Sequence, residues 1–276
     1  MSPINRFTKF IVQGLFGAPP GSDNWEIVET PILSTPVYSG NGHWGCIPIN
    51  SCLTSFNLLT AAAAAATADP YTLSLGTGTE VIARATKGGE NIKTQASTPA
   101  DADNAMLIPA ANSAGYSAIA AQTQPRLRTR VNLTQITAIV FGAGLDQNVT
   151  SPILTSTSGD GAGLMFDPLN KSVTGLPAAS LPNWILVQKI NGTNTFADSG
   201  VAVVAGVDYE LEVRYGPDNI PVYYINGTLI ANASAAAGTA TTVLGFVVGV
   251  QKNGSDGATQ KDFDCRYILA GRQQIG

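Results

Sequence analysis

The sequence predicts an all-β protein, built as an antiparallel jelly-roll β-sandwich that follows an extended, loop-rich N-terminal arm. From Tyr71 onward, short strand-like runs alternate with clusters of Gly, Pro, Asn and Asp. No stretch keeps a helical period of 3.6 residues for more than a couple of turns. Many short strands separated by turn residues are typical of a sandwich or a barrel. We therefore expect an arm over residues 1–50 and a jelly-roll domain over residues 51–276.

The N-terminal arm is dense in Pro and Gly and shows no sustained period of either 2 or 3.6 residues. Aromatic residues are scattered through it. We predict that these aromatic side chains dock onto the surface of a partner protein; the alternative is a loop-rich part of the same domain that packs on its own core. The predicted partner-binding residues are Phe7, Phe10, Phe16, Trp25, Tyr38 and Trp44.

The segment after the arm contains the alanine run Ala61–Ala66, which ends at Asp69-Pro70. Alanine favours a helix, but the run is short and has no amphipathic face, so a strand packed closely on a neighbour fits equally well. Strand-like runs follow. The expected strands cover 71–75, 79–85, 104–108, 126–141, 162–166, 184–190, 201–204, 208–215, 220–225, 228–231, 242–251 and 262–270.

The clearest strand pattern lies in Tyr209–Tyr215, where apolar and charged residues alternate strictly. This alternation places the apolar residues on one face of a half-buried antiparallel strand. The turn residues at 216–219 lead into a second strand over 220–225, so the pair is expected to form a hairpin. Asn226-Gly227 is a favoured type I′ turn, because both central residues must take positive φ. We therefore expect three consecutive strands to form a meander.

The run YELEVRYGPDNIPVYYINGTLI, residues 209–230, resembles the signature hairpins of the concanavalin A-like, laminin G-like jelly roll. The likeness extends over about 100–276 and implies that the last strand returns beside the first. The neighbouring pieces that fall in the family's order are Pro125–Phe141 (early strand), Gly142–Asp146 (the "G-L-D" loop), Gly163–Asp167 (next strand), Asn183–Gly192 (the strand after it) and Lys261–Ile268 (last strand).

Jelly rolls of this kind that are rich in Ala, Gly and Thr are similar to structural proteins of tailed bacteriophages. The resemblance implies a virion protein on the capsid surface, a cement or decoration protein that binds the major capsid protein as a homotrimer, with residues 1–50 as its arm. The low charged content of 12% suits burial in such an assembly, because few charges keep neighbouring copies apart. The alternative is a glycan-binding head or tail fibre, with Trp184, Tyr223 and Tyr224 as stacking platforms or as core aromatics.

The sequence gives little ground for catalysis, and we expect a protein that is not an enzyme and holds no cofactor. Glucanases of this fold carry E-x-D-x-x-E on one strand, and that string is absent. Glu210 and Glu212 share one strand face with Cα atoms ~7 Å apart, but they are expected to be solvated carboxylates opposite a polar neighbour. The only histidine, His43, lies in the arm, which argues against a Ser-His-Asp triad.

No metal site is expected either. Cys46, Cys52 and Cys265 are expected to be free thiols, and the first two match no standard zinc spacing with His43. Two loop positions could supply oxygen ligands to calcium, but hairpin turns require such residues anyway. These positions are Asp160 and Asp218-Asn219.

Neither nucleic acid nor a membrane is an expected partner. The net charge is −4, and the only basic cluster is Arg126, Arg128 and Arg130, which share one face of a strand. Three arginines fall short of the field that a duplex-binding protein needs. We expect them on a solvated face or paired with the carboxylates of a neighbouring subunit. No apolar run reaches the ~20 residues that cross a bilayer, and we expect a soluble protein.

Overall fold

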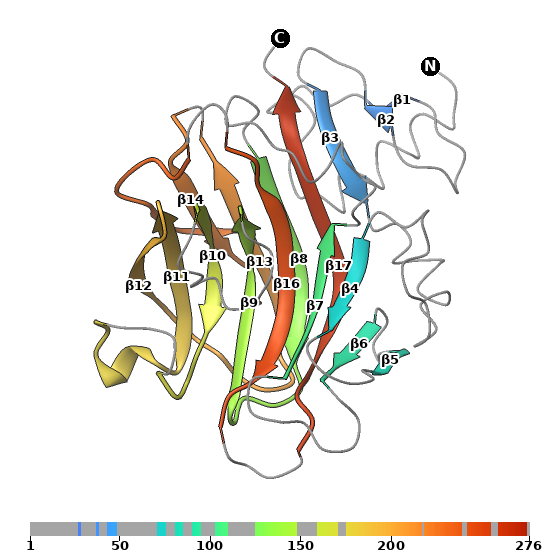
Figure 1. The fold of residues 1–276 in the computed structure, drawn as a ribbon, viewed down its shortest axis with the longest axis vertical. Coiled ribbons are helices and arrows are strands. Elements are labelled where there is room, and N and C mark those ends of the chain that lie inside the picture. The colour runs from blue at the N-terminus through green and yellow to red at the C-terminus, as the bar shows by residue number, and fades with distance from the viewer. Residues whose placement is uncertain are drawn as a thin grey trace.

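The computed structural model confirms a nearly all-β protein (Figure 1). It describes residues 27–28, 37–38, 43–48, 71–75, 81–84, 90–94, 103–109, 125–147, 159–170, 175–216, 218–238, 242–254 and 259–274. For the short strands before Asn91, the description covers the backbone alone. Among all the described residues, the helical structure is one 3₁₀ turn, η3 (Ala178–Ser180).

The sheet that faces the viewer in Figure 1 has seven strands, all antiparallel to their neighbours. Its spatial order is β12 (Thr193–Ala202), β11 (Asn183–Ile190), β10 (Gly161–Phe166), β9 (Ile139–Asp146), β16 (Gly245–Lys252), β7 (Asn104–Pro109) and β4 (Tyr71–Leu75).

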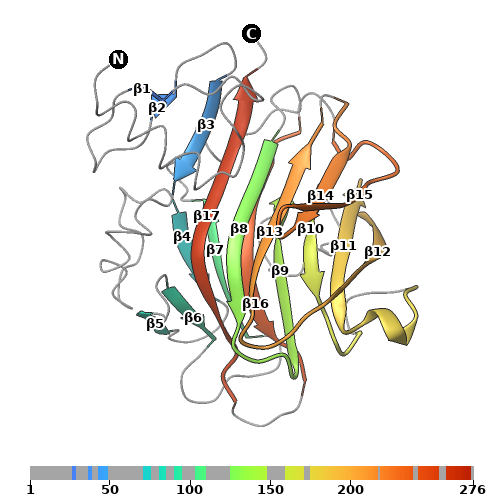
Figure 2. The same cartoon turned by 180° about the vertical axis from the view of Figure 1, so that it is seen from behind.

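The sheet that faces the viewer in Figure 2 has eight antiparallel strands. Its main path is β15 (Thr228–Asn232), β14 (Pro221–Ile225), β13 (Asp208–Tyr215), β8 (Pro125–Leu133), β17 (Asp262–Gln274), β6 (Glu90–Lys93) and β5 (Val81–Arg84). The eighth strand, β3 (His43–Pro48), pairs with the second half of the long strand β17, whose first half pairs with β6. A separate two-stranded sheet joins β1 (Ile27–Val28) to β2 (Val37–Tyr38).

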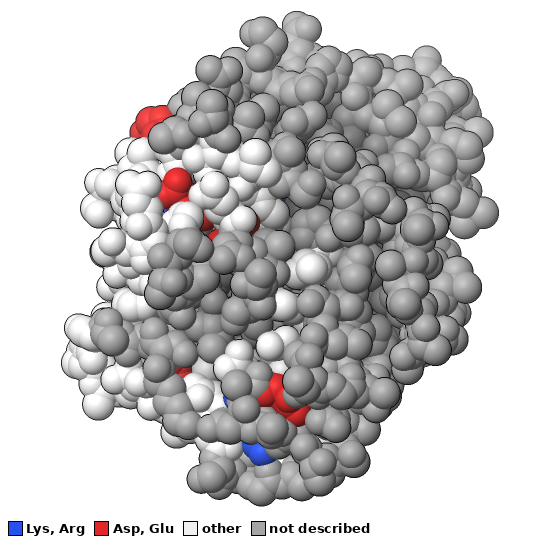
Figure 3. Space-filling view, viewed as in Figure 1, with Lys and Arg blue, Asp and Glu red and all other residues white. Residues whose placement is uncertain are grey.

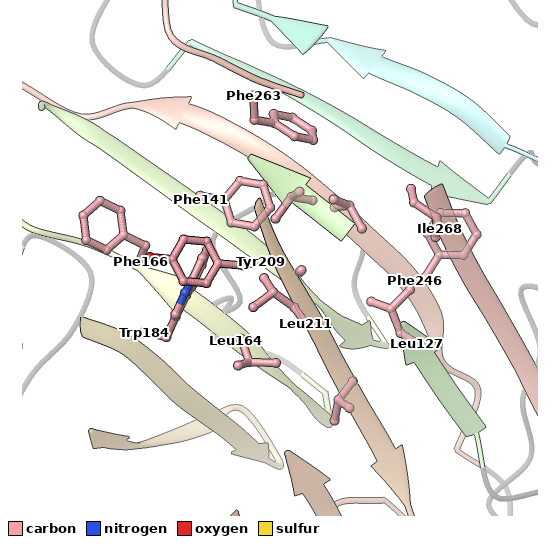
Figure 4. Close-up of a cluster of buried hydrophobic side chains, with 14 of the residues drawn as sticks. Leu127, Phe141, Leu164, Phe166, Trp184, Tyr209, Leu211, Phe246, Phe263 and Ile268 are labelled. Atoms are coloured by element: carbon pink, nitrogen blue, oxygen red, sulfur yellow. The ribbon is translucent and has the colours of Figure 1, made fainter. Parts of the chain in front are cut away.

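The hydrophobic core lies between the two large sheets, where alternate residues of both face inward. Trp184 is fully buried there, and its ring meets the rings of Phe141, Phe166 and Tyr209 edge-on, with centroids 5.8, 6.2 and 5.4 Å away (Figure 4). Edge-to-face packing of this kind adds ~0.5–1.5 kcal/mol per pair to the burial of apolar area. The aromatic cluster thus joins β9, β10 and β11 of one sheet to β13 of the other.

The meander predicted over 208–231 is confirmed, with β14 pairing to both β13 and β15. Asn226 and Gly227 take φ of 52° and 75°, as a type I′ turn requires. The expected return of the last strand is also confirmed, because β17 pairs with β8.

Two expectations about the early strands are wrong. Residues 126–141 form two strands in different sheets, because the chain turns at 134–138, where Ala138 takes φ of 48°. This turn brings both Leu133 and Phe141 into the core. Residues 142–146, expected as a loop, belong to strand β9. The alanine run Ala61–Ala66 lies outside the described residues.

Two buried tyrosines of the eight-stranded sheet differ in their hydrogen bonding. The hydroxyl of Tyr223 donates to the carbonyl oxygen of Val187 at 2.8 Å, which ties β14 to β11 across the core. The hydroxyl of Tyr215 has no hydrogen-bond partner in the described part of the chain. Burial raises the pKa of both phenols, and for Tyr215 the nearby Tyr223, Asp146 and Asp160 raise it further.

Replacement of each tyrosine by phenylalanine should therefore change stability in opposite directions. Tyr223→Phe is expected to lower the free energy of unfolding by about 1 kcal/mol, because a buried hydrogen bond is lost. Tyr215→Phe is expected to raise it by up to about 1 kcal/mol, because the desolvated hydroxyl disappears. Urea unfolding of the two variants measures both changes, and a loss of equal size in both would contradict the assignment.

Candidate ligand-binding face

The two sheets present very different faces on the side turned away from the core. On the seven-stranded sheet, this face carries apolar side chains that form a second buried cluster. Between them lie glycines of β9, β10 and β16. Figure 3, seen from this side, shows Lys, Arg, Asp and Glu of the described residues in only a few small areas. The glycines are Gly142, Gly144, Gly161, Gly163, Gly245 and Gly249.

One ion pair is buried on this apolar face. The ammonium nitrogen of Lys189 lies 2.6 and 2.7 Å from the two carboxylate oxygens of Asp146, and both side chains are almost fully buried. Gly161 of β10 stands between them in the sheet, paired with Asp146 on one side and Lys189 on the other. A Cβ atom at Gly161 would lie 3.1 Å from Asp146 Oδ2, so the glycine leaves room for the lysine to cross β10.

The outward face of the eight-stranded sheet carries a set of charged side chains, which we call the polar ladder. It runs over the three central strands β13, β8 and β17, which lie side by side in Figure 2. Its members are Arg126, Arg128, Arg130, Asp208, Glu210, Glu212, Arg214, Asp264 and Arg266.

The charges of β8 and β13 pair diagonally across the two strands. In the register, Arg128 stands opposite Glu212 and Arg130 stands opposite Glu210. Each arginine nevertheless pairs with the next acidic residue along β13 on the same face. The N–O distances are 2.5 Å for Arg128–Glu210 and 3.1 Å for Arg130–Asp208. Opposite charges on neighbouring strands stabilise a sheet and also fix the rotamers of the long side chains.

One end of the polar ladder is buried around Glu212, whose side chain is 3% exposed. Its carboxylate is 2.5 Å from Arg126 Nε and 3.9 Å from Arg128 Nε, and it also accepts a hydrogen bond from Arg214 Nε. Burial lowers the pKa of Arg126, as do Arg214 and Arg128, while Glu212 acts in the opposite direction. The expectation of solvated glutamates is therefore wrong for Glu212.

The arginine prediction is also corrected. Arg126, Arg128 and Arg130 share one face as expected, but their partners are carboxylates of the same chain on β13, not those of a neighbouring subunit. The first two are buried, and only Arg130 is half exposed. Pairing of β8 with β13 explains this, because it places an acidic strand beside the basic one.

The other end of the ladder is accessible to solvent around Asp208. Its carboxylate accepts a hydrogen bond from Asn132 Nδ2 at 2.9 Å and pairs with Arg130 and, at 3.5 Å, with Arg266. A β-bulge between Cys265 and residue 267 accompanies the approach of Arg266. Burial acts to raise the pKa of Asp208, but Asn132 and the two arginines outweigh it and hold the pKa below its ordinary value.

Of the three aromatics expected either as stacking platforms or as core residues, only Tyr224 lies on this face. Trp184 and Tyr223 are core residues with 0% and 2% exposure, which confirms the core alternative for both. Tyr224 is half-buried on β14, and the guanidinium carbon of Arg214 lies 4.5 Å from its ring centroid. Its cross-strand neighbours are Glu212 on β13 and the exposed Leu229 on β15.

The predicted arm residues stay largely outside this description. Phe7, Phe10, Phe16 and Trp25 lie outside the described residues, and so does Cys52; Tyr38 and Trp44 are described in the backbone alone, in β2 and β3. His43 and Cys46 also belong to β3, with no side chain described. Their predicted roles, and the division of the chain at residue 50, remain predictions. Cys265 is a buried thiol whose Sγ lies 3.9 Å from Thr129 Oγ1.

The carboxylates of the two calcium candidates accept hydrogen bonds from backbone N–H groups. Asp160 Oδ1 accepts a hydrogen bond from the backbone nitrogen of Asn191, and Asp218 Oδ1 accepts one from that of Ile220. Within the described ranges, no group of three or more His, Cys, Asp or Glu side chains could hold a metal ion. The same part of the chain contains no helix long and apolar enough to cross a membrane.

No protein-family model matches the chain, and no curated protein matches its sequence. Solved structures share its fold. A protein of unknown function from Shewanella oneidensis MR-1 superposes with a TM-score of 0.54 at 11% identity, covering 100% of this chain and 95% of that one. Alginate lyase A1-II′, of polysaccharide lyase family 7, superposes with a TM-score of 0.51 at 9% identity, covering 74% of this chain and 95% of that one. The carbohydrate recognition domain of Emp46p superposes with a TM-score of 0.47 at 11% identity, covering 73% of this chain and 87% of that one.

The chain has a jelly-roll β-sandwich fold. One of the similar structures, the alginate lyase, is an enzyme that acts on a polysaccharide. The expectation that the chain is not an enzyme is corrected by this finding: an alginate lyase is among the similar structures, so the jelly roll gives no reason to exclude catalysis. At identities of 9–11%, the likenesses establish the fold and carry no residue roles to this chain.

Proposed function

We propose that the chain binds a glycan on the outward face of β8, β13 and β14, where several groups of the polar ladder reach solvent beside Tyr224. The groups that this face presents are Arg130, Asp208, Glu210, Arg214 and Tyr224. The observation that carries the proposal is the combination of charged groups held in place by mutual ion pairs with a half-buried aromatic ring on one open sheet face. A polysaccharide lyase among the similar folds supports it.

The chemistry of this face suits sugars. Sugar hydroxyls both donate and accept hydrogen bonds, and carboxylates and guanidinium groups supply the complementary acceptors and donors. Because ion pairs already fix these side chains, binding costs less of their rotamer entropy than it would on a surface of free side chains. An aromatic ring contributes apolar area for the C–H face of a sugar at little conformational cost.

A glycan array followed by calorimetry tests the proposal. Wild-type protein is expected to bind at least one glycan. Tyr224→Ala is expected to raise the Kd about tenfold, which corresponds to a loss of about 1.4 kcal/mol of binding free energy. Leu169→Ala serves as the control, because Leu169 is 46% exposed in the turn after β10 of the other sheet. The same samples are assayed for new sugar ends, to learn whether the bound glycan is cleaved. Absence of any binding, or equal binding by the Tyr224 variant, would contradict the proposal.

A capsid role stays a prediction. A cement protein that binds the major capsid protein as a homotrimer on the virion surface is favoured by the charged content of 12% and by the family resemblance of residues 209–230. The structural likenesses bear on the fold and not on this role. Images of intact particles that place the chain on the shell would support it, and its absence from purified particles would exclude it.

A further inference from the structure

We infer that Arg214 is the position at which the carboxylate of an acidic sugar binds. The inference rests on the proposed function and names the class of glycan and the residue that selects it. Arg214 lies on β13 at the border between the charged part of the polar ladder and an apolar strip on β14 and β15. Its side chain is 37% exposed, so a ligand can reach it.

The guanidinium of Arg214 is held in one orientation. Its Nε donates to Glu212 Oε1, and its carbon lies 4.5 Å from the ring centroid of Tyr224. Within the described part of the chain, its two terminal nitrogens have no protein partner. A guanidinium whose Nε is fixed and whose terminal nitrogens face solvent presents the forked geometry that binds a carboxylate through two parallel hydrogen bonds.

The local charge also favours an added anion. Glu212 is the shared partner of three arginines, Arg126, Arg128 and Arg214. Arg126 and Arg214 stand opposite each other in the register and repel, and this repulsion contributes to the lowered pKa of Arg126. A carboxylate bound at Arg214 would offset that repulsion, whereas a neutral ligand would leave it unchanged.

The surroundings of Arg214 suit a sugar ring. On the β14 side its cross-strand neighbour is the half-buried Val222, and Tyr224 and the 53% exposed Leu229 continue the same face. A uronic or sialic acid combines a carboxylate with the C–H face of a ring, so it can meet the guanidinium and the apolar strip at once. An acidic side chain of a protein offers the carboxylate without that ring.

Calorimetry with matched pairs of ligands tests the inference. The ligands are oligomers of galacturonate, mannuronate and glucuronate and a sialylated oligosaccharide, each compared with its methyl ester, together with a poly-glutamate peptide. Wild-type protein is expected to bind at least one acidic glycan about tenfold more tightly than its ester. Arg214→Gln should remove this preference, Arg214→Lys should keep part of it, and Lys93→Gln, a cation of β6 on the same sheet, should leave it intact.

The outcomes separate this inference from the proposed function. If esters and acids bind equally, and Arg214→Gln has no effect while Tyr224→Ala weakens binding, the face binds glycans but the assignment of Arg214 is wrong. If no glycan of any kind binds, both the proposed function and the assignment of Arg214 are wrong. If poly-glutamate binds as tightly as the acidic glycans and depends on Arg214, the site recognises acidic protein segments instead. Unfolding curves of the Arg214 variants verify that each one is folded.

Discussion

Replacement of Lys189 by methionine is expected to lower the free energy of unfolding by about 3–5 kcal/mol, because it leaves the carboxylate of Asp146 buried without its cation. Both side chains are within 3% of complete burial, and the ammonium nitrogen contacts both carboxylate oxygens. A loss of this size is a large part of the total stability of a typical domain. Denaturation in urea, with the midpoint and slope fitted together, measures it.

A double replacement separates the ion pair from packing. Asp146→Leu combined with Lys189→Met removes both charges, and buried pairs replaced by apolar residues often recover most of the stability. We expect the double variant to be more stable than Lys189→Met alone. A single variant that loses less than about 1 kcal/mol, or a double variant that is the least stable of the set, would contradict the description of this pair as mutually dependent.

Replacement of Trp184 by alanine is expected to cost about 3–5 kcal/mol, because it empties the largest fully buried site of the described core. Three aromatic rings lose their contact with the indole, at centroid distances of 5.4–6.2 Å. Trp184→Phe should cost less than alanine, since a ring remains. The phenylalanine also removes an indole N–H that has no hydrogen-bond partner in the described residues.

The exposed Leu229 provides the control for the tryptophan series. Leu229→Ala should change the free energy of unfolding by no more than about 0.5 kcal/mol, since the side chain is 53% exposed. If Trp184→Ala were as stable as wild type and had instead lost glycan binding, the placement of this residue in the core would be wrong. In that case the alternative role of Trp184 as a stacking platform would hold.

The strands that the sequence predicted best are those with one buried and one exposed face. Tyr209–Tyr215 alternates because β13 has the core on one side and the polar ladder on the other. The sequence does not predict β12 over residues 193–200, because this edge strand has little burial on either face and so carries no apolar alternation. The glycines of β9 favour a loop in the sequence, but they lie in a strand on a buried sheet face, opposite other glycines such as Gly163 and Gly249.

The candidate site was predictable only in parts. The alternation of Arg126, Arg128 and Arg130 and that of Glu210 and Glu212 are visible in the sequence. Their pairing is not, because partners such as Arg128 and Glu210 are 82 residues apart in the chain and only the sheet topology makes β8 and β13 neighbours. Likewise, alternation cannot tell the buried Trp184 from the accessible Tyr224, because it does not say which face of a strand is covered.

The most direct test of glycan binding by the polar ladder is a nuclear magnetic resonance titration that follows the arginine Nε–H signals and a ¹³C-labelled tyrosine ring. Addition of a glycan found on the array is expected to shift the signals of Arg214 and Tyr224, and to leave those of the core residues Tyr209 and Tyr223 unchanged. Unchanged signals of Arg214 and Tyr224 at saturating glycan would contradict the account.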